Sequence, residues 1–184
     1  MLTRDEALDL VKANISRKNV IFHMIAVEAV MRGLAKHLGE DEVLWGLTGL
    51  LHDIDYEKVD GEWKKHGVLA EEILKGRVSE TAIQAIKSHN YENTGVVPKN
   101  KLDKALIASD SISGLLVACA LVMPSKKLRD VKVKSVRKKY KSKDFAKGVS
   151  RERIQFCEKI KVPMEQFFEI SLESLKQYAE EIGL

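Results

Sequence analysis

The sequence predicts an all-helical protein with a single domain. Only three prolines interrupt its 184 residues, and no run of alternating β-branched residues is long enough to build a sheet. Apolar residues instead recur every three or four positions, as they do on one face of a helix. With 45% apolar residues the chain can form one well-buried core but is short for two. We therefore expect one domain over residues 1–184.

The first third of the chain predicts three helices. One runs from about Thr3, an N-cap with Glu6 three residues later, to Ala13. A second covers residues 19–39 and can end at Gly39. Its apolar positions are separated by alternating steps of four and three: Val20, Met24, Val27, Met31, Leu34 and Leu38. The third begins at Asp41, is apolar nearly all round like a central helix, and ends in His52-Asp53.

The middle of the chain predicts two short helices between polar loops. A loop over residues 55–65 leads to a helix over residues 66–74. A second helix covers residues 79–89 and has Ala82, Ile83 and Ile86 as its buried row. The loop that follows contains the turn formers Asn93, Gly95 and Pro98.

Two further helices are predicted in the second half. The helix over residues 101–122 is rich in small side chains, which lets neighbouring helices approach closely, and Pro124 stops it. The valines of residues 131–136 admit either a short extended piece or a helix over residues 134–140. A final helix begins near Pro163, a good first-turn residue, and runs to Glu181.

The charge of the chain is concentrated in one segment. Residues 126–153 contain thirteen Lys or Arg against three acidic residues, whereas the formal net charge of the whole chain is only +4. Such a segment indicates an anionic partner, either a phosphorylated small molecule or a nucleic acid, or else a solvated basic face. Few aromatic residues interleave with these lysines, which argues against a platform for single-stranded nucleic acid.

The cysteines and the chain start predict a cytoplasmic protein. Cys119 and Cys157 are isolated, with no CxxC spacing, and are expected to be small buried side chains in a reducing compartment. The N-terminus becomes acidic at once instead of opening an apolar export segment. Apolar runs such as residues 115–123 are shorter than the roughly 20 residues that cross a bilayer, so no membrane association is expected.

Four of the five histidines fall at the ends or inner edges of predicted helices. They are His23, His52, His66 and His89, whereas His37 lies on a polar face. Imidazole and carboxylate together suit Fe, Mn, Zn, Co or Ni, and such a site assembles well from facing helices. Asp110 lies beside a buried row, where an unpaired carboxylate would cost several kcal/mol. Its partner is therefore a metal cation or, alternatively, a buried Lys or Arg.

The order His23, His52-Asp53, Asp110 resembles the signature of the HD superfamily of metal-dependent phosphohydrolases. The phrase Leu50-Leu51-His52-Asp53-Ile54-Asp55 at the end of an apolar helix also resembles that family. The resemblance covers residues 19–116 and implies an HD-like helical bundle with a metal-binding core. Residues 125–184 then form an appended basic segment and a C-terminal helix packed on that core.

The resemblance also implies how the site works. Members with two further histidines, here His66 and His89, bind two metals, and the Asp of the pair, here Asp53, bridges them and orients the attacking hydroxide. A mononuclear site would leave those two histidines to bind or protonate the substrate. From the residues, Asp55 or Glu57 is a candidate general base, with an exposed loop acid as the alternative.

The expected substrate is a small phosphate mono- or diester, nucleotide-like or another phosphorylated metabolite. Where the binuclear form of the family has Gly and Lys after His-Asp-Ile, this chain has Asp55 and Tyr56, which argues against cyclic-dinucleotide hydrolysis. The missing cation is expected from the basic segment, at Lys134, Arg137, Lys138 and Lys143. Two alternatives stay open: a di-iron oxygenase of the same family, and a non-catalytic regulatory module that binds metal or nucleic acid.

Overall fold

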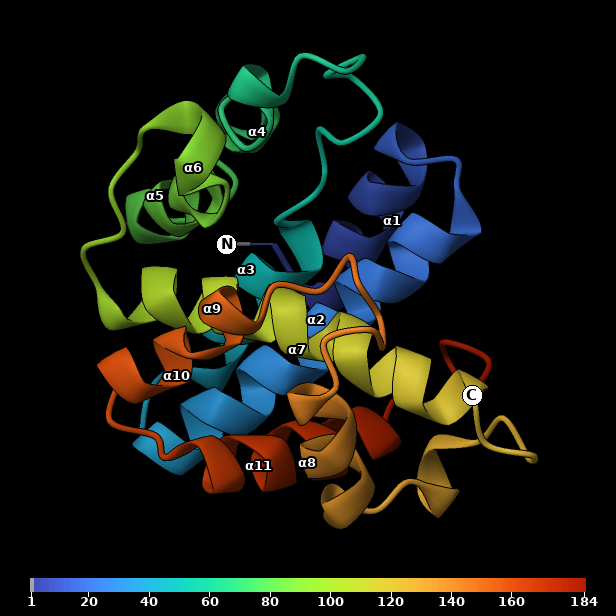
Figure 1. Ribbon diagram of the computed structural model, residues 1–184. Helices are drawn as coiled ribbons and strands as arrows, with labels where there is room; N and C mark the ends of the chain where they lie inside the picture. Colours follow the sequence, from blue (N-terminus) through green and yellow to red (C-terminus); the bar gives the residue numbers. More distant parts are fainter. Residues whose placement is uncertain (1) are drawn as a thin grey trace.

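The computed structural model describes residues 2–184, and this range is helical with no strand (Figure 1). The all-helical fold class is confirmed. The helices are α1 (Arg4–Asn14), α2 (Lys18–Leu38), α3 (Glu42–Leu51), α4 (Leu69–Leu74), α5 (Glu80–His89), α6 (Tyr91–Thr94), α7 (Lys101–Leu121), α8 (Val133–Lys141), α9 (Arg151–Ile154), α10 (Phe156–Lys159) and α11 (Met164–Lys176). Two 3-10 turns add Trp63–Lys65 and Leu128–Asp130.

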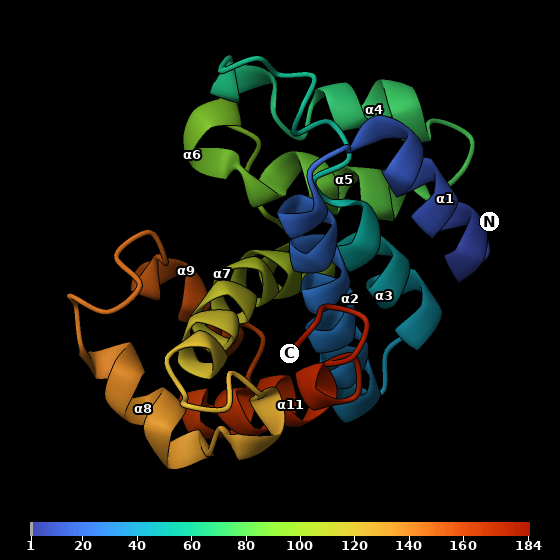
Figure 2. The same cartoon turned by 90° about the vertical axis from the view of Figure 1, so that its right-hand side faces the viewer.

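The two longest helices, α2 and α7, lie at the centre of the bundle. Helices α4, α5 and α6 gather at one end, and α8 and α11 lie at the other (Figures 1 and 2). Helix α2 contacts α3, α7 and α11, and α7 also contacts α5. The apolar stripe predicted for α2 is buried from Val20 to Leu34. Small residues of α7 such as Ala105 and Ala108 are fully buried, which explains how several helices pack around it.

Local sequence signals set the helix ends that hold the site. Thr3 and Glu6 form a capping box at α1. Gly39 ends α2 in the left-handed conformation with φ of 68°. The Asp41 carboxylate accepts hydrogen bonds from the backbone N–H of Val43 and Leu44 and so caps α3. Each of these three ends lies within a residue or two of the position that the sequence predicts.

Several boundaries differ from the expectation. Helix α4 begins at Leu69 instead of residue 66, because Gly67 has φ of 88°, which a right-handed helix does not allow. Tyr91–Thr94 forms a short helix inside the expected loop, and α9 and α10 are additional. Residues 133–141 are helical, which excludes the extended alternative. Helix α11 ends at Lys176 instead of Glu181 and is followed by turns. Helix α3 is expected to be apolar and buried nearly all round, but its Val43 is 53% exposed.

Both cysteines and the long helix α7 are interior features. Cys119 and Cys157 are buried and free, as expected, and burial raises the pKa of their thiols to about 11 and about 12. By length and composition α7 could cross a bilayer, but 67% of its most apolar stretch of 18 residues is buried inside the protein. Helix α7 is thus accounted for as the core helix of this bundle.

Gly49 lies where α3 crosses the backbone of α2. A Cβ atom at this position would lie 3.0 Å from both the backbone nitrogen of Glu28 and the carbonyl oxygen of Val27. We expect Gly49→Ala to lower the free energy of unfolding by about 1–3 kcal/mol, because the two helices must separate. The loss should appear although Ala favours a helix over Gly by about 1 kcal/mol. Urea denaturation measures it.

The matched control is Val43→Ala on the exposed side of the same helix. This variant should change stability by no more than about 0.5 kcal/mol, because Val43 has few neighbours to lose. Equal stability of the two variants would contradict the close approach of α2 and α3.

Candidate metal centre

Six side chains from separate parts of the chain meet between the helices. His23 comes from α2, and Asp110 comes from α7. His52 caps the end of α3 and Asp53 follows it, while His89 is the last residue of α5. His66 follows the 3-10 turn Trp63–Lys65. The sequence predicts all six as metal ligands, and the structure brings all six together.

The first group surrounds one side of Asp53. Nε2 of His23 lies 3.1 Å from Oδ1 of Asp110 and 3.8 Å from Oδ2 of Asp53. Nε2 of His52 lies 3.2 Å from Oδ1 of Asp53 and 3.9 Å from Oδ1 of Asp110. The potential ligand atoms of His23, His52 and Asp53 all lie within 4.8 Å of one another. Two imidazoles and two carboxylates therefore surround one point that a divalent cation can occupy.

The second group uses the same carboxylate. Nε2 of His66 lies 3.2 Å, and Nε2 of His89 3.4 Å, from Oδ1 of Asp53. The two imidazole nitrogens are 3.1 Å apart, and the potential ligand atoms of these three residues also lie within 4.8 Å of one another. Asp53 belongs to both groups, so its carboxylate is the point that the two groups share.

The Nδ1 atoms of the histidines fix which nitrogen faces the cluster. Nδ1 of His52 lies 2.8 Å from the carbonyl oxygen of Gly49, and Nδ1 of His89 contacts the carbonyl oxygen of Ile86. A carbonyl only accepts hydrogen bonds, so both Nδ1 atoms carry the proton. The Nε2 lone pairs of His52 and His89 are left to face the cluster. This is the arrangement of histidines that ligate metals, since the second nitrogen sets the tautomer.

Two features of the cluster suit a bound cation. Nε2 of His52 is buried without any hydrogen-bond partner, and burial, which outweighs the attraction of Asp53 and Asp110, lowers the pKa of His52 to about 4. Burial also acts to lower the pKa of His66, but hydrogen bonds to Asp53 and Asp55 raise it to about 10. The carboxylates thus attract positive charge to a place where a neutral imidazole has an unused lone pair, and a metal ion satisfies both.

Asp55 and Glu57, the expected candidates for a general base, have other contacts. Asp55 is fully buried instead of exposed. Its Oδ1 lies 2.9 Å from Nδ1 of His66, and its Oδ2 accepts hydrogen bonds from the backbone N–H of Gly67 and Ala70. Both oxygens of Asp55 are thus engaged, and its carboxylate orients the His66 ring.

The side chain of Glu57, which follows α3 in the sequence, contacts the connection between α1 and α2. Its carboxylate accepts hydrogen bonds from the backbone N–H of Ser16 and Arg17 and from the hydroxyl of Ser16. The Arg17 and Ser16 hydrogen bonds lower the pKa of Glu57. A carboxylate held in this way binds a proton less readily, and its contacts hold it at the start of α2.

Arg153 contacts the cluster from outside the predicted set. Its Nη2 lies 2.8 Å from Oδ2 of Asp110 and donates to the carbonyl oxygen of His89 at 2.7 Å, while its Nη1 lies 3.1 Å from the carboxylate of Glu92. Of the two partners that the sequence allows for Asp110, the structure shows the arginine, at Oδ2, while Oδ1 faces Nε2 of His23. Arg153 belongs to the basic segment of residues 126–153, which predicts an anionic partner. The spacing of basic residues in that segment does not distinguish Arg153 from the others.

The four basic residues expected to bind substrate do not line the cavity at the cluster. That cavity has a volume of about 340 Å³ and is lined by His23, Asp110, Ser111, Gly114, Gly148, Val149, Ser150 and Arg153. Lys134, Arg137 and Lys138 lie on α8, where Arg137 pairs with Glu165, and Lys143 lines a different hollow. The chain turns after α8, so that Gly148, Val149, Ser150 and Arg153 line this cavity in their place.

Arg151 holds that wall in shape. Its guanidinium donates hydrogen bonds to the backbone carbonyls of Lys139, Tyr140, Ser142, Phe145, Ala146 and Val149. The first two carbonyls belong to the last turn of α8 and the other four to the loop between α8 and α9, so the arginine ties the end of this helix to the loop that follows it. The loop is thereby fixed beside Asp110.

Comparison with known proteins gives one family match. A family model described as the HD domain matches residues 20–115, just over half of the chain. This range includes His23, Asp110 and the four cluster residues between them, whereas α8 to α11 and Arg153 lie beyond it. No solved structure matches the chain.

The two ligand groups predict two ions per chain. We expect His89→Ala to reduce the bound divalent metal from two ions to one, because only the second group loses a ligand. Metal analysis of protein loaded with Mn²⁺ or Zn²⁺ and then desalted measures the ratio. His37→Ala, which removes an exposed histidine from α2, is the matched control and should retain two ions. A single ion in both the control and the unsubstituted protein would contradict the binuclear arrangement.

Arg153 is expected to strengthen metal binding through Asp110. In Arg153→Gln the carboxylate loses its outer hydrogen bond, so metal affinity should fall by about 10- to 100-fold, the usual effect of such a partner. Titration with a chelating dye measures this change. Arg137→Gln, an arginine whose ion pair with Glu165 is exposed, should leave the affinity unchanged. Equal affinities for the two variants would rule out the role assigned to Arg153.

Proposed function

This chain belongs to the HD domain family, and on that basis we propose that it is a metal-dependent phosphohydrolase. The observation that carries the proposal is the shared carboxylate of Asp53, with two pairs of imidazole nitrogens around it. An arginine lies at the edge of the same cavity. Phosphoryl transfer needs this combination of cation sites and positive charge, because negative charge spreads over the phosphoryl oxygens as the ester bond breaks.

The residues present fit two divalent ions. His23, His52, Asp53 and Asp110 would hold one, and Asp53, His66 and His89 would hold the other. Bound in this way, divalent ions lower the pKa of coordinated water so that hydroxide forms near neutral pH, and they offset charge on phosphoryl oxygens. The ligand types do not select among Fe, Mn, Zn, Co and Ni, since mixed imidazole and carboxylate sites accept all of them.

The protein's own groups position the reactants. Asp53 is held between four imidazoles, so its carboxylate is fixed at the point that both ion sites share. Asp55 keeps His66 in one orientation, and Arg153 does the same for Asp110. The hydroxyls of Ser111 and Ser150 line the cavity together with Arg153 and provide hydrogen-bond donors for phosphate oxygens.

The substrate that suits this site is a small phosphate mono- or diester, with nucleotides among the candidates. A cavity of about 340 Å³ accommodates a small molecule. The cation that the sequence led us to expect in the basic segment is supplied here by Arg153, the last residue of that segment. We therefore place the phosphate-binding role at Arg153, and not on α8.

Substitution of Asp53 tests the proposal. We expect Asp53→Asn to lower phosphate release by at least about a hundredfold, because the shared ligand loses its charge at both ion sites. The assay screens phosphomonoesters and phosphodiesters with Mn, Fe, Co, Ni and Zn. Asp9→Asn on the exposed side of α1 is the matched control and should keep full activity.

Two results would count against the proposal. Undiminished turnover by Asp53→Asn would exclude the assigned centre. Oxygen uptake by the iron-loaded protein, without hydrolysis of any ester, would favour an oxygenase, because the same ligands also suit a di-iron site.

A further inference from the structure

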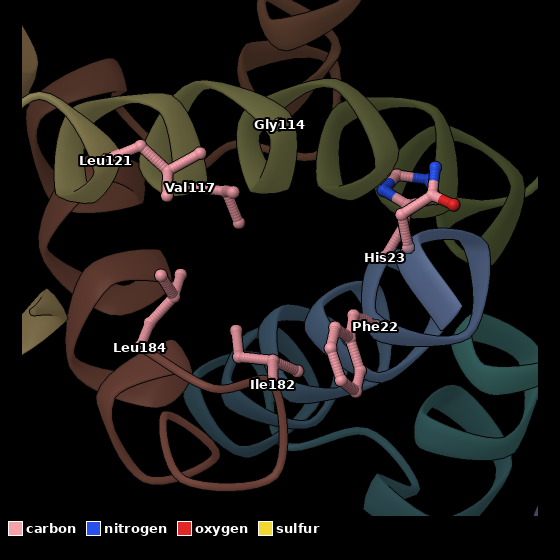
Figure 3. Close-up of a pocket in the computed structure, with 8 residues that line it drawn as sticks. Phe22, His23, Gly114, Val117, Leu121, Ile182 and Leu184 are labelled. Atoms are coloured by element: carbon pink, nitrogen blue, oxygen red, sulfur yellow. The ribbon is translucent and has the colours of Figure 1, made fainter. Parts of the chain in front are cut away.

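An apolar cavity adjoins the metal centre. It lies between α2, α7 and the C-terminal residues, and has a volume of about 250 Å³ (Figure 3). Its apolar lining residues are Phe22, Val117, Leu121, Ile182 and Leu184. The only polar side chains that line it are those of Asn19 and His23. The cavity is therefore suited to a hydrocarbon group and offers little to a polar one.

This cavity shares two lining residues with the polar cavity at the cluster. His23 and Gly114 line both. Figure 3 shows His23 at one end of the apolar cavity, opposite the part of α7 that carries Gly114. A Cβ atom on Gly114 would come within 3.3 Å of a methyl group of Val149, so a larger residue would crowd the place where the two cavities meet. Because His23 and Gly114 belong to both linings, a molecule with its phosphate at the cluster would have its ester group next to the apolar cavity.

The apolar side chains of this cavity are not all covered by the protein itself. Phe22 is 37% exposed and Leu121 is 51% exposed. A ligand that covers exposed apolar side chains binds more tightly, because burial removes these side chains from water. A hydrocarbon group in the cavity beside the cluster would cover Phe22 and Leu121 in this way.

We infer that the apolar cavity binds the hydrocarbon part of the substrate, which is a phosphate ester of an aliphatic alcohol. This inference rests on the proposed function and narrows it. In the reaction, the oxygen of a water molecule forms a bond to phosphorus and the bond from phosphorus to the ester oxygen breaks. The alcohol leaves with a proton, inorganic phosphate is the other product, and no oxidant or reductant is needed.

A nucleoside fits the same cavity less well. A base carries several hydrogen-bond donors and acceptors on its edge, and the Asn19 side chain is the one neutral amide in the lining. Each buried polar atom left without a partner lowers affinity by about tenfold or more. An aliphatic chain has no such atoms, and its methylene groups match Val117, Leu121 and Ile182.

A series of alkyl phosphates tests the inference with the metal-loaded protein. From ethyl through butyl and hexyl to octyl phosphate, kcat/KM should rise by about fourfold per methylene until the cavity is full, which is the value of burying one CH₂ group. Adenosine monophosphate, the comparison substrate, should be hydrolysed less efficiently than hexyl phosphate.

One tryptophan substitution on α7 and one at the residue that follows this helix provide a matched pair. Val117→Trp fills the cavity and should remove the dependence of kcat/KM on chain length. Val122→Trp places the same side chain at a position that is 57% exposed and does not line the cavity, and should keep the dependence. If Val117→Trp does not fold, Leu121→Gln at the exposed rim should reduce the octyl-to-ethyl ratio by several fold.

Binding is measured apart from turnover. Octylphosphonate, which cannot be hydrolysed, should bind to the unsubstituted protein with a negative heat-capacity change, and more weakly to Val117→Trp. No chain-length dependence, or a preference for adenosine monophosphate, in a protein that hydrolyses esters would overturn the inference and leave the phosphohydrolase intact. Octylphosphonate binding without hydrolysis of any ester would support the cavity's role and refute the proposed function.

Discussion

One buried carboxylate is the constraint on which the rest of this structure depends. The Nε2 atoms of His52, His66 and His89 lie within 3.4 Å of Asp53 Oδ1, and that of His23 lies 3.8 Å from Oδ2. Lone pairs and negative charge do not gather in a protein interior unless a cation offsets them. The backbone carbonyls behind His52 and His89 and the carboxylate behind His66 all hold the rings in this one arrangement.

Much of the fold could be predicted because its signals are local. Apolar spacing in α2 and the caps Thr3, Gly39 and Asp41 determine helix ends through neighbouring residues alone. The prediction failed where a distant contact decides the conformation. The start of α4 depends on Gly67, whose Cβ would lie 2.7 Å from the carbonyl oxygen of Ile86 on another helix, and no local pattern reveals that approach.

The same distinction applies to the candidate site. The six histidine and aspartate positions could be named from the sequence because their order resembles a known signature and the helices carry them inward. The hydrogen bonds of Asp55 and Glu57 could not be predicted, since the sequence of a loop does not indicate which donors an acidic side chain meets after folding. Arg153 was missed because its meaning depends on where the chain returns after α8, and this return is set by packing of α8 to α11 on the core.

The cavity wall beside Asp110, formed by residues between 148 and 153, depends on one side chain. Six carbonyls from the last turn of α8 and the loop that follows it share one arginine, Arg151. Three of them, those of Lys139, Ser142 and Ala146, also accept a backbone N–H. Loss of this one guanidinium would remove a hydrogen-bond partner from six points of the segment at once, so the shape of the wall beside Asp110 depends on a residue outside the cluster itself.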